Sequence, residues 1–313
     1  MMSPMILDTP VATDPEARIL AIQKRSWIGY PRAQAIRQQL DDLLNHPKVP
    51  RMPNLAIIGE TNNGKSSILG SFYRRHQPPD DPNIDRRPLP ILMIDTPPEP
   101  DEGRLYRHML RHLFATVGRR EPSDLLFDRL KVLLRYLDTK MIVLDGFNCA
   151  VAGTPVKQRR FLNALRLMGN DLQFPIVVAG TPETLAALQS DPQLANRFEP
   201  AFLPKWKLDS DYARLLMSVE KGFALQNPSD LAHPKFAQRL LDLSEGILGE
   251  TMELLRRLAI RAIRSGEEQI TPEMLKPDVL RSIHWVEPSR RTANLRQRRK
   301  KETPSALAGS GGS

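Results

Sequence analysis

The stretch LAIIGETNNGKSS, residues 55–67, decides the fold of this chain. Its first half is a short apolar run that ends in glycine, which predicts a buried strand, and a helix is expected to begin near Lys65. Between the two, residues 59–66 match the pattern GxxxxGK[ST] at every fixed position. The glycines let backbone N–H groups face phosphate oxygens, and the helix N-terminus adds its dipole. A chance glycine turn is the alternative, and the pattern favours a P-loop within an α/β fold.

The P-loop pattern assigns chemical roles to several residues. Lys65 is expected to reach the β- and γ-phosphates of ATP, and the hydroxyl of Ser66 to bind Mg²⁺. The second half of such a site is an acidic residue at the end of a neighbouring strand. The run MIVLD supplies Asp145, which we expect to hold Mg²⁺ directly or through water. The other residues expected to contact the nucleotide are Gly59, Thr61, Asn62, Asn63, Gly64 and Ser67.

The rest of the pattern alternates strands and helices and then turns helical. Further buried strands are predicted at 90–95, 140–146 and 174–180, and helices at 31–46, 102–117, 123–138 and 156–170. This alternation indicates a parallel α/β sheet. After Pro204 the strand pattern stops. Helices are predicted at 209–224, 234–244, 250–265 and 271–282, the last with Thr271 as its N-cap.

Four parts are therefore expected along the chain. They are a flexible N-terminus (1–20), an α/β ATPase core (21–205), a helical lid domain (206–286) and a basic, flexible tail (287–313). Within the tail, the window from Pro288 to Lys301 has seven cations and no acid, and so holds seven of the nine net positive charges. It is either a solvated extension or an arm that binds nucleic acid. The terminal GSGGS resembles an engineered linker and predicts no function of its own.

Composition excludes several classes of protein. The chain has 313 residues, of which 41% are hydrophobic and 26% charged, so a sizeable core can form. No apolar run approaches the roughly 20 residues of a membrane span, and the start lacks a secretory signal. Cys149 is the single cysteine, which excludes internal disulfides and Cys-based zinc sites. We expect a cytoplasmic protein without a membrane partner.

Four segments together resemble the TniB family. They are RSWIGYPRA (25–33), RMPNLAIIGETNNGKSS (51–67), the strand that ends in Asp145, and GTPETLAALQSDPQLANRFEPAFLPKW (180–206). TniB proteins are AAA+ ATPases of transposons that also encode a DDE transposase (TniA- or TnsB-like) and a TniQ-type target-selection protein. The TnsC proteins of CRISPR-associated transposons share the pattern. The resemblance implies a five-stranded parallel sheet with a helical lid, and ATP bound between adjacent subunits.

The resemblance also implies roles for particular residues. Arg197 matches the arginine finger offered to a neighbour's nucleotide, although it could instead pair with Asp191 or Glu199. Thr181 matches the sensor-1 position, or it caps the helix begun by Pro182. The aromatic segment Trp27, Ile28 and Tyr30 resembles the part that lines the adenine, or supplies ordinary core side chains. No sensor-2 arginine is assigned, because Glu250 follows Gly249 and Arg256 and Arg257 lie further on.

One departure from the family pattern bears on hydrolysis. In many such ATPases a glutamate follows the strand-ending aspartate and orients the attacking water, but here Gly146 follows Asp145. We expect weak hydrolysis, unless Asp95 or Glu99 substitutes.

Relatives form rings or helical filaments around duplex DNA, and basic side chains face the bore. The candidates here follow the second strand: Arg104, Arg107, Arg111, Arg119 and Arg120. Arg104, Arg107 and Arg111 are spaced for one helical face, and a solvated basic face is the alternative reading. The favoured function is an ATP-dependent, DNA-binding oligomer that links target selection to the transposase. The alternatives are a catalytic AAA+ motor or loader, and a nucleotide-gated scaffold with no DNA role.

Overall fold

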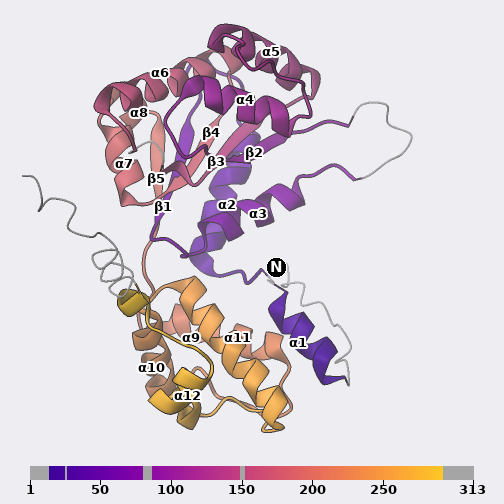
Figure 1. Cartoon of the computed structure of the whole chain (residues 1–313), viewed down its shortest axis with the longest axis vertical. Helices are drawn as coiled ribbons and strands as arrows, with labels where there is room; N and C mark the ends of the chain where they lie inside the picture. Colours follow the sequence, from indigo (N-terminus) through magenta and orange to yellow (C-terminus); the bar gives the residue numbers. More distant parts are fainter. Residues whose placement is uncertain (1–13, 25–26, 80–86, 149–151, 292–313) are drawn as a thin grey trace, which may run out of the picture. The chain divides into compact units, whose positions relative to one another are not determined.

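The computed structural model describes residues 14–24, 27–79, 87–148 and 152–291. It consists of two compact units, which are described separately (Figure 1). The α/β unit spans Gly29–Pro204, and the helical unit contains the described residues of Met1–Ile28 and Lys205–Ser313. Cys149 and the tail from residue 292 onward lie outside the described residues.

The α/β unit is built on a five-stranded parallel sheet in the order β2-β3-β4-β1-β5. The strands are β1 (Asn54–Gly59), β2 (Ile91–Asp95), β3 (Met141–Asp145), β4 (Ile176–Gly180) and β5 (Phe198–Leu203). Central strands β1, β3 and β4 are buried along their whole length, as expected for a sheet covered on both faces. The predicted fold class and the four predicted strands are confirmed.

Strand β5 carries no apolar run in the sequence. FEPAFL has only three buried residues and a proline in its middle. Proline cannot donate a ladder hydrogen bond and is therefore confined to edge strands, bulges and strand starts. β5 is an edge strand that pairs with β1 alone, so Pro200 is tolerated there. Its low hydrophobicity explains why the pattern predicted four strands and the family resemblance five.

Helices cover both faces of this sheet (Figure 1). They are α2 (Pro31–Leu44), α3 (Lys65–Arg75), α4 (Glu102–His112), α5 (Ser123–Tyr136), α6 (Pro155–Leu172), α7 (Pro182–Gln189) and α8 (Pro192–Ala195). Ala56 and Ile58 of β1 share a hydrophobic core with α4, α5 and α6. The alternate residues of β1, Leu55 and Ile57, point to the opposite face. α3 runs beside β1, β3 and β4, and α2 packs on α3.

The helical unit has its own hydrophobic core. Its helices are α1 (Pro15–Gln23), α9 (Ser210–Phe223), α10 (Pro234–Ser244), α11 (Leu248–Ser265), a 3₁₀ helix (Pro272–Leu275) and α12 (Pro277–Ser282). Residues 15–20 were expected to be flexible, and this expectation is wrong. Asp14 caps α1, Ile19 and Ile22 join the core, and Arg18 forms a buried ion pair with Glu268 at 2.7 Å.

Two further expectations about the helical unit are corrected. The predicted helix 271–282 is split, because Lys276 precedes a proline and is held in the extended region at ψ 148°. Thr271 makes no side-chain capping bond. The start of the predicted flexible tail is helical at 288–291, where Arg291 pairs with buried Glu250. Among the described helices, none is long and apolar enough to cross a membrane.

Candidate nucleotide-binding site

The P-loop connects the carboxyl end of β1 to the first turn of α3. Asn62 and Gly64 adopt left-handed conformations, with φ of 62° and 94°, which curl the chain between strand and helix. Gly64 is the N-cap of α3 and supplies no side-chain cap, so the first amides of this 11-residue helix have no capping side chain. A Cβ on Gly59 would lie 2.8 Å from the Leu203 carbonyl oxygen, so glycine is required there. The uncapped first turn of α3 therefore fits a phosphate group on its backbone N–H donors.

Lys65 begins α3 and is folded back over the loop. Its Nζ donates to the carbonyl oxygens of Gly59 at 2.7 Å and Glu60 at 2.8 Å. Burial lowers the pKa of Lys65, and the carboxylates of Asp145 and Glu60 oppose this effect. A half-buried ammonium that also senses Asp145 is suited to phosphate oxygens beside a metal ion. Thr61, Ser66 and Ser67 are exposed around it.

Asn63 ties the loop to the neighbouring strand. Its side chain is 2% exposed, and its amide nitrogen donates to the carbonyls of Leu203 at 2.9 Å and Pro204 at 3.0 Å. Asn63 was expected to contact nucleotide. Its side chain holds the loop against the end of β5.

Asp145 lies at the end of β3, separated from β1 by β4. Its side chain is 6% exposed, and Oδ1 accepts a hydrogen bond from the Gly146 amide at 2.8 Å. Asp95, at the end of β2, is in register with Asp145 and is exposed. Registered residues of parallel strands point to the same face, so both carboxylates lie at the same edge and on the same side of the sheet. Glu99 instead pairs with Arg104 at 3.5 Å.

The residue types at this edge fit a magnesium ion. Within the described residues there is no group of three or more His, Cys, Asp or Glu side chains that could hold a metal. Mg²⁺ needs no such cage, since it usually binds one or two protein oxygens, several waters and substrate phosphates. The hydroxyl of Ser66 and the carboxylate of Asp145 would be those protein oxygens.

Asn148 connects the ends of β3 and β4. Its Oδ1 accepts from the backbone amide of Thr181 at 2.9 Å and from Oγ1 of buried Thr184 at 3.3 Å. Thr181 occupies the N-cap position of α7, but its side chain makes no capping bond. Its hydroxyl instead hydrogen-bonds Glu183, which lowers the pKa of that carboxyl. The capping alternative for Thr181 is therefore wrong. A role for Asn148 in holding Thr181 has no signal in the sequence.

Arg197 lies at the opposite edge of the sheet. It immediately precedes β5, whose first residue is in register with Asn54, the first residue of β1. The P-loop follows the other end of β1, six residues away, which corresponds to about 16–20 Å of strand. Arg197 therefore cannot act on a nucleotide in this chain's own P-loop. It donates to Asn170 Oδ1 at 2.7 Å, and among the described residues no acid pairs with it, so the predicted alternatives Asp191 and Glu199 are wrong.

The aromatic segment is divided between the two units. Trp27 and Ile28 belong to the helical unit, and Ile28 packs on its hydrophobic core. Tyr30 is buried in the α/β unit, and burial raises the pKa of its hydroxyl to about 12. Nearby Arg32 donates to the Phe202 carbonyl at 2.7 Å, so the start of α2 lies near the carboxyl end of β5. Tyr30 is thus placed at the P-loop edge of the sheet.

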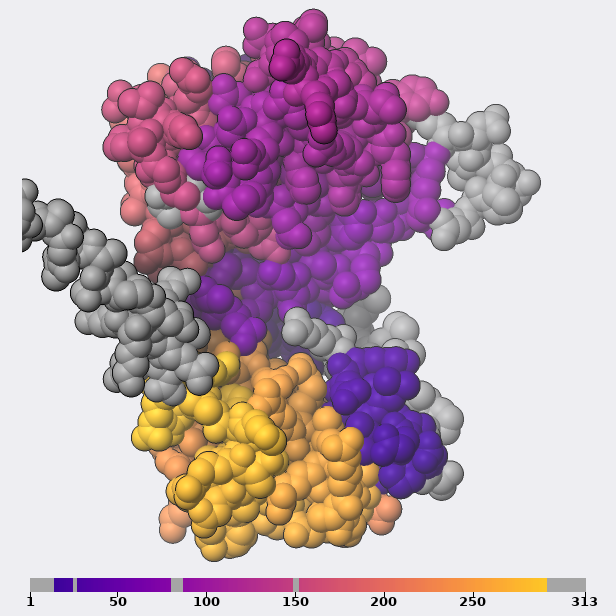
Figure 2. Space-filling model, viewed as in Figure 1, coloured from indigo at the N-terminus to yellow at the C-terminus, as the bar shows by residue number. Residues whose placement is uncertain are grey.

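The five basic residues expected to face DNA differ in exposure and in hydrogen bonding. Arg104, Arg111, Arg119 and Arg120 are exposed on the α4–α5 segment, which forms part of the visible surface in Figure 2. Arg107 is half-buried and donates to the Glu121 carbonyl at 2.8 Å. It anchors the loop between α4 and α5, which corrects the expectation of three arginines on one free face. No acid occurs from Gly103 to Arg120.

The sequence did not single out Phe114 in this segment. It is 98% exposed and has φ of 57°, in the left-handed position after α4 that usually belongs to glycine.

The sensor-2 arginine remains unassigned in the structure. Glu250 accepts a hydrogen bond from Arg291. Arg256 and Arg257 both pair with Glu253, and Arg257 also donates to the carbonyls of Ile283 and His284. Arg257 and Arg291 therefore tie α11 to the segment that follows α12, whereas Arg256 pairs within α11.

The sheet order, the P-loop at one edge and the helical unit define a P-loop ATPase fold of the AAA+ class. Solved structures of that class resemble the chain. Cdc6p from Pyrobaculum aerophilum has a TM-score of 0.55 and 17% identity, over 80% of this chain and 67% of that one. The Aeropyrum pernix ORC1 protein in complex with DNA has a TM-score of 0.56 and 16% identity, over 82% of this chain and 67% of that one. Drosophila ORC bound to DNA has a TM-score of 0.55 and 12% identity, over 90% of this chain and 69% of that one.

The particular family is identified from sequence. The model of the bacterial TniB protein family matches residues 18–208, which is more than half of the chain, and the chain belongs to this family. The resemblance stated above is thereby confirmed. A search of curated proteins found no match.

Proposed function

We propose that this TniB protein is an ATP-dependent regulator of transposition that assembles on duplex DNA and links target selection to the transposase. One observation carries the proposal: the P-loop and Arg197 lie at opposite edges of one sheet. We call the side of the sheet where the strands begin the amino edge, and the side where they end the P-loop edge. A site divided in this way is complete only when the amino edge of one subunit meets the P-loop edge of the next. Such a head-to-tail contact generates rings or helical filaments.

ATP with Mg²⁺ is the proposed assembly ligand. Lys65 and the amides of α3 bind the phosphates, Ser66 and Asp145 hold the metal, and Arg197 of the adjacent subunit adds a cation. Thr181 is the sensor of the γ-phosphate. Residues 206–286 act as the lid, and Trp27, Ile28 and Tyr30 line the adenine. Gly146 lacks the carboxylate that would activate water, so ATP serves binding more than turnover.

The α4–α5 segment supplies the proposed DNA contacts. Arg104, Arg111, Arg119 and Arg120 are exposed, and the acid-free segment around them complements a polyanion. Contacts of this kind are to phosphates and are largely independent of sequence. The expected protein partners are a TniQ-type target-selection protein and a DDE transposase, in the cytoplasm, with or without a CRISPR effector.

The test is electron microscopy and sedimentation with a non-hydrolysable ATP analogue and duplex DNA. Lys65→Ala should abolish nucleotide binding and the DNA-bound assembly. Arg197→Ala should bind nucleotide as a monomer and assemble poorly. Lys235→Ala removes an exposed lysine on α10, outside the α/β unit that carries both edges of the sheet, and is the matched control. Equal assembly without nucleotide would refute the proposal, and ATP turnover of several per second would favour a motor.

DNA contacts are tested by salt dependence. Each phosphate contact that is removed should reduce the slope of log K against log salt by about 0.9. Arg111→Ala should show this reduction, whereas Arg107→Ala should destabilise the α4–α5 loop. Truncation after Arg291 tests the tail and keeps the Arg291–Glu250 pair. An unchanged slope would show that the tail is a solvated extension.

A further inference from the structure

A hollow opens at the amino edge of the sheet, beside Arg197. Its volume is about 680 Å³. It is lined by residues from the segment before β1, from α8 and from the start of β5. The polar side chains among them are Arg51, Asn54, Gln193, Asn196, Arg197 and Glu199. This edge lies opposite the P-loop, so the hollow is no part of the chain's own nucleotide site.

Three arginines gather around this hollow from three separate segments. Arg51 precedes β1, Arg166 lies on α6 and Arg197 precedes β5. Arg197 donates to the Asn170 side chain at 2.7 Å, and Arg166 donates to the Gln193 side chain at 2.5 Å. Arg51 is exposed at the rim. Two of the three guanidinium groups are thus held by neutral amide oxygens, which orient them without cancelling their charge.

Within the described residues, none of the three arginines forms an ion pair, although the carboxylate of Glu199 also lines the hollow. The charge of Asp191 raises the pKa of Arg197, but the Asp191 carboxylate accepts hydrogen bonds from the amides of Gln193 at 2.8 Å and Leu194 at 3.4 Å. Burial lowers the pKa of Arg197, and the charges of Arg51 and Arg166 lower it further. Like charges held together without a counter-ion are suited to a ligand that carries several negative charges.

We propose that Arg51 is a second arginine that, with Arg197, contacts the phosphates of a nucleotide bound to another copy of this chain. Arg166 is a positioning residue. It does not line the hollow, but it holds Gln193 on the wall of the hollow and adds a positive charge nearby. This inference rests on the proposed head-to-tail assembly and specifies its interface. A triphosphate concentrates several charges on adjacent groups, and a pair of guanidinium groups can bind its oxygens in a planar, bidentate manner.

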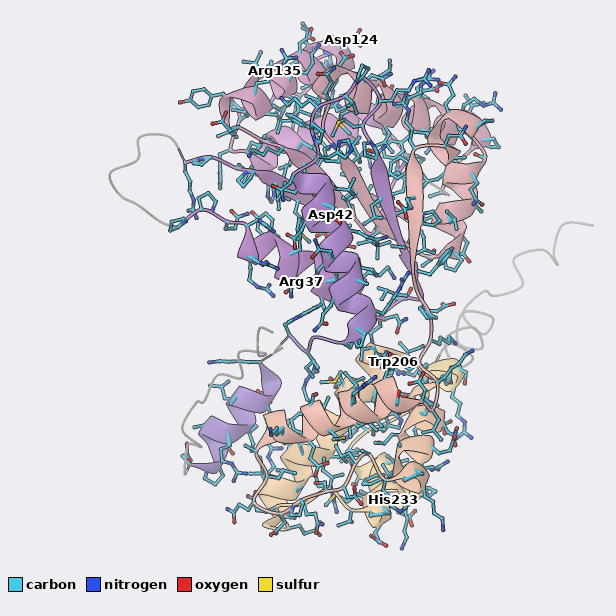
Figure 3. All side chains as sticks on the ribbon, turned by 180° about the vertical axis from the view of Figure 1, so that it is seen from behind. Arg37, Asp42, Asp124, Arg135, Trp206 and His233 are labelled. Atoms are coloured by element: carbon cyan, nitrogen blue, oxygen red, sulfur yellow. The ribbon has the colours of Figure 1, made fainter. Side chains whose placement is uncertain are left out.

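The test compares Arg51→Ala and Arg51→Lys with Arg135→Ala. Arg135 is an exposed arginine on α5, labelled in Figure 3, and is the charge-matched control. Binding of a fluorescent ATP analogue at protein concentrations below assembly should be unchanged in all three. The concentration needed for half-assembly with the ATP analogue should rise about 10- to 100-fold in Arg51→Ala, the range for loss of a charged hydrogen bond. Arg51→Lys should fall between Arg51→Ala and wild type, and Arg135→Ala should match wild type.

Mixing variants shows whether Arg51 acts in trans. Arg51→Ala keeps its P-loop, and Lys65→Ala keeps its amino edge. At concentrations below those at which Arg51→Ala assembles alone, an equimolar mixture should form ATP-dependent dimers, because the one intact interface joins the two variants. No dimer from soluble, folded variants would overturn the proposal.

Other outcomes separate this inference from the proposed function. Wild-type assembly that ignores nucleotide refutes the proposed function itself. Nucleotide-dependent assembly that Arg197→Ala weakens and Arg51→Ala leaves unchanged refutes the inference alone. If Arg51→Ala lowers the DNA affinity of Lys65→Ala protein, which cannot assemble, the cluster binds DNA phosphates and the inference is wrong.

Discussion

Replacing Gly146 tests why this chain is expected to hydrolyse ATP slowly. Gly146 directly follows the buried Asp145, has φ of 66°, and a Cβ built on it meets nothing within 4 Å. The Cβ of a glutamate therefore meets no obstacle at the place where the family pattern expects that residue. The conformational cost is the left-handed backbone, about 1–2 kcal/mol for a residue with a Cβ.

The matched control is Gly146→Gln, which has the same shape and the same backbone strain but no carboxylate. In both variants the melting temperature should fall by about 2–4 °C for each kcal/mol of conformational cost, in a domain of this size. General-base assistance accelerates reactions by about 10²–10⁴-fold, equivalent to about 2.7–5.4 kcal/mol of activation free energy. Gly146→Glu should therefore exceed Gly146→Gln in turnover even after the strain is taken into account.

The assay is steady-state ATP hydrolysis with saturating duplex DNA, run on wild type and both variants. Equal turnover of the two variants would refute the reasoning. Wild-type turnover of several per second would show that another residue activates water. Asp95, in register with Asp145, is then the first carboxylate to replace with Asn. Glu99→Gln is second, because Glu99 pairs with Arg104.

Three further predictions concern stability and the loop. Glu268→Gln should destabilise the helical unit by about 3 kcal/mol at neutral pH, because it leaves Arg18 buried without its counter-ion. The Arg18 hydrogen bond lowers the pKa of Glu268. The ion pair therefore stabilises the folded protein fully above the ordinary pKa of a glutamate, and this stabilisation is lost as pH falls through the pKa of folded Glu268. In denaturant melts between about pH 5 and 3, Glu268→Gln should consequently lose less stability than wild type. Phe114→Gly should stabilise the α/β unit by about 1 kcal/mol in thermal melts, since glycine adopts the left-handed conformation without strain, and no change would show that the loop relaxes. Asn63→Ala should weaken ATP binding in calorimetry, as the loop loses two hydrogen bonds to the end of β5; an unchanged affinity would show that the loop holds its shape without them.

Local patterns determined the P-loop and most of the sheet. Buried parallel strands are continuous apolar runs, so β1, β2, β3 and β4 could be predicted from hydrophobicity alone. The GxxxxGK[ST] pattern placed Lys65 correctly at the start of a helix, because a strand-to-helix turn needs its glycines at fixed positions. The edge strand β5 has no such run and was implied by the family resemblance alone.

Other features depended on contacts between residues far apart in sequence. The spacing of Arg107 suggested a free basic face, but its hydrogen bond to the Glu121 carbonyl holds it against the next loop. The α1 segment looked like a lead-in, because the stabilising partner of Arg18 is Glu268, 250 residues away. Neither partner can be read from local periodicity.

The sequence by itself determined the phosphate-binding chemistry, because that chemistry resides in one continuous loop whose residue types and spacing are its mechanism. The tertiary structure alone decided that three arginines gather at the edge of the sheet opposite the P-loop. Arg51, Arg166 and Arg197 are brought together by the parallel pairing of β1 with β5 and by α6 beside them. The same pairing places the P-loop one strand length away, so Lys65 and these arginines stand at two opposite edges of the sheet.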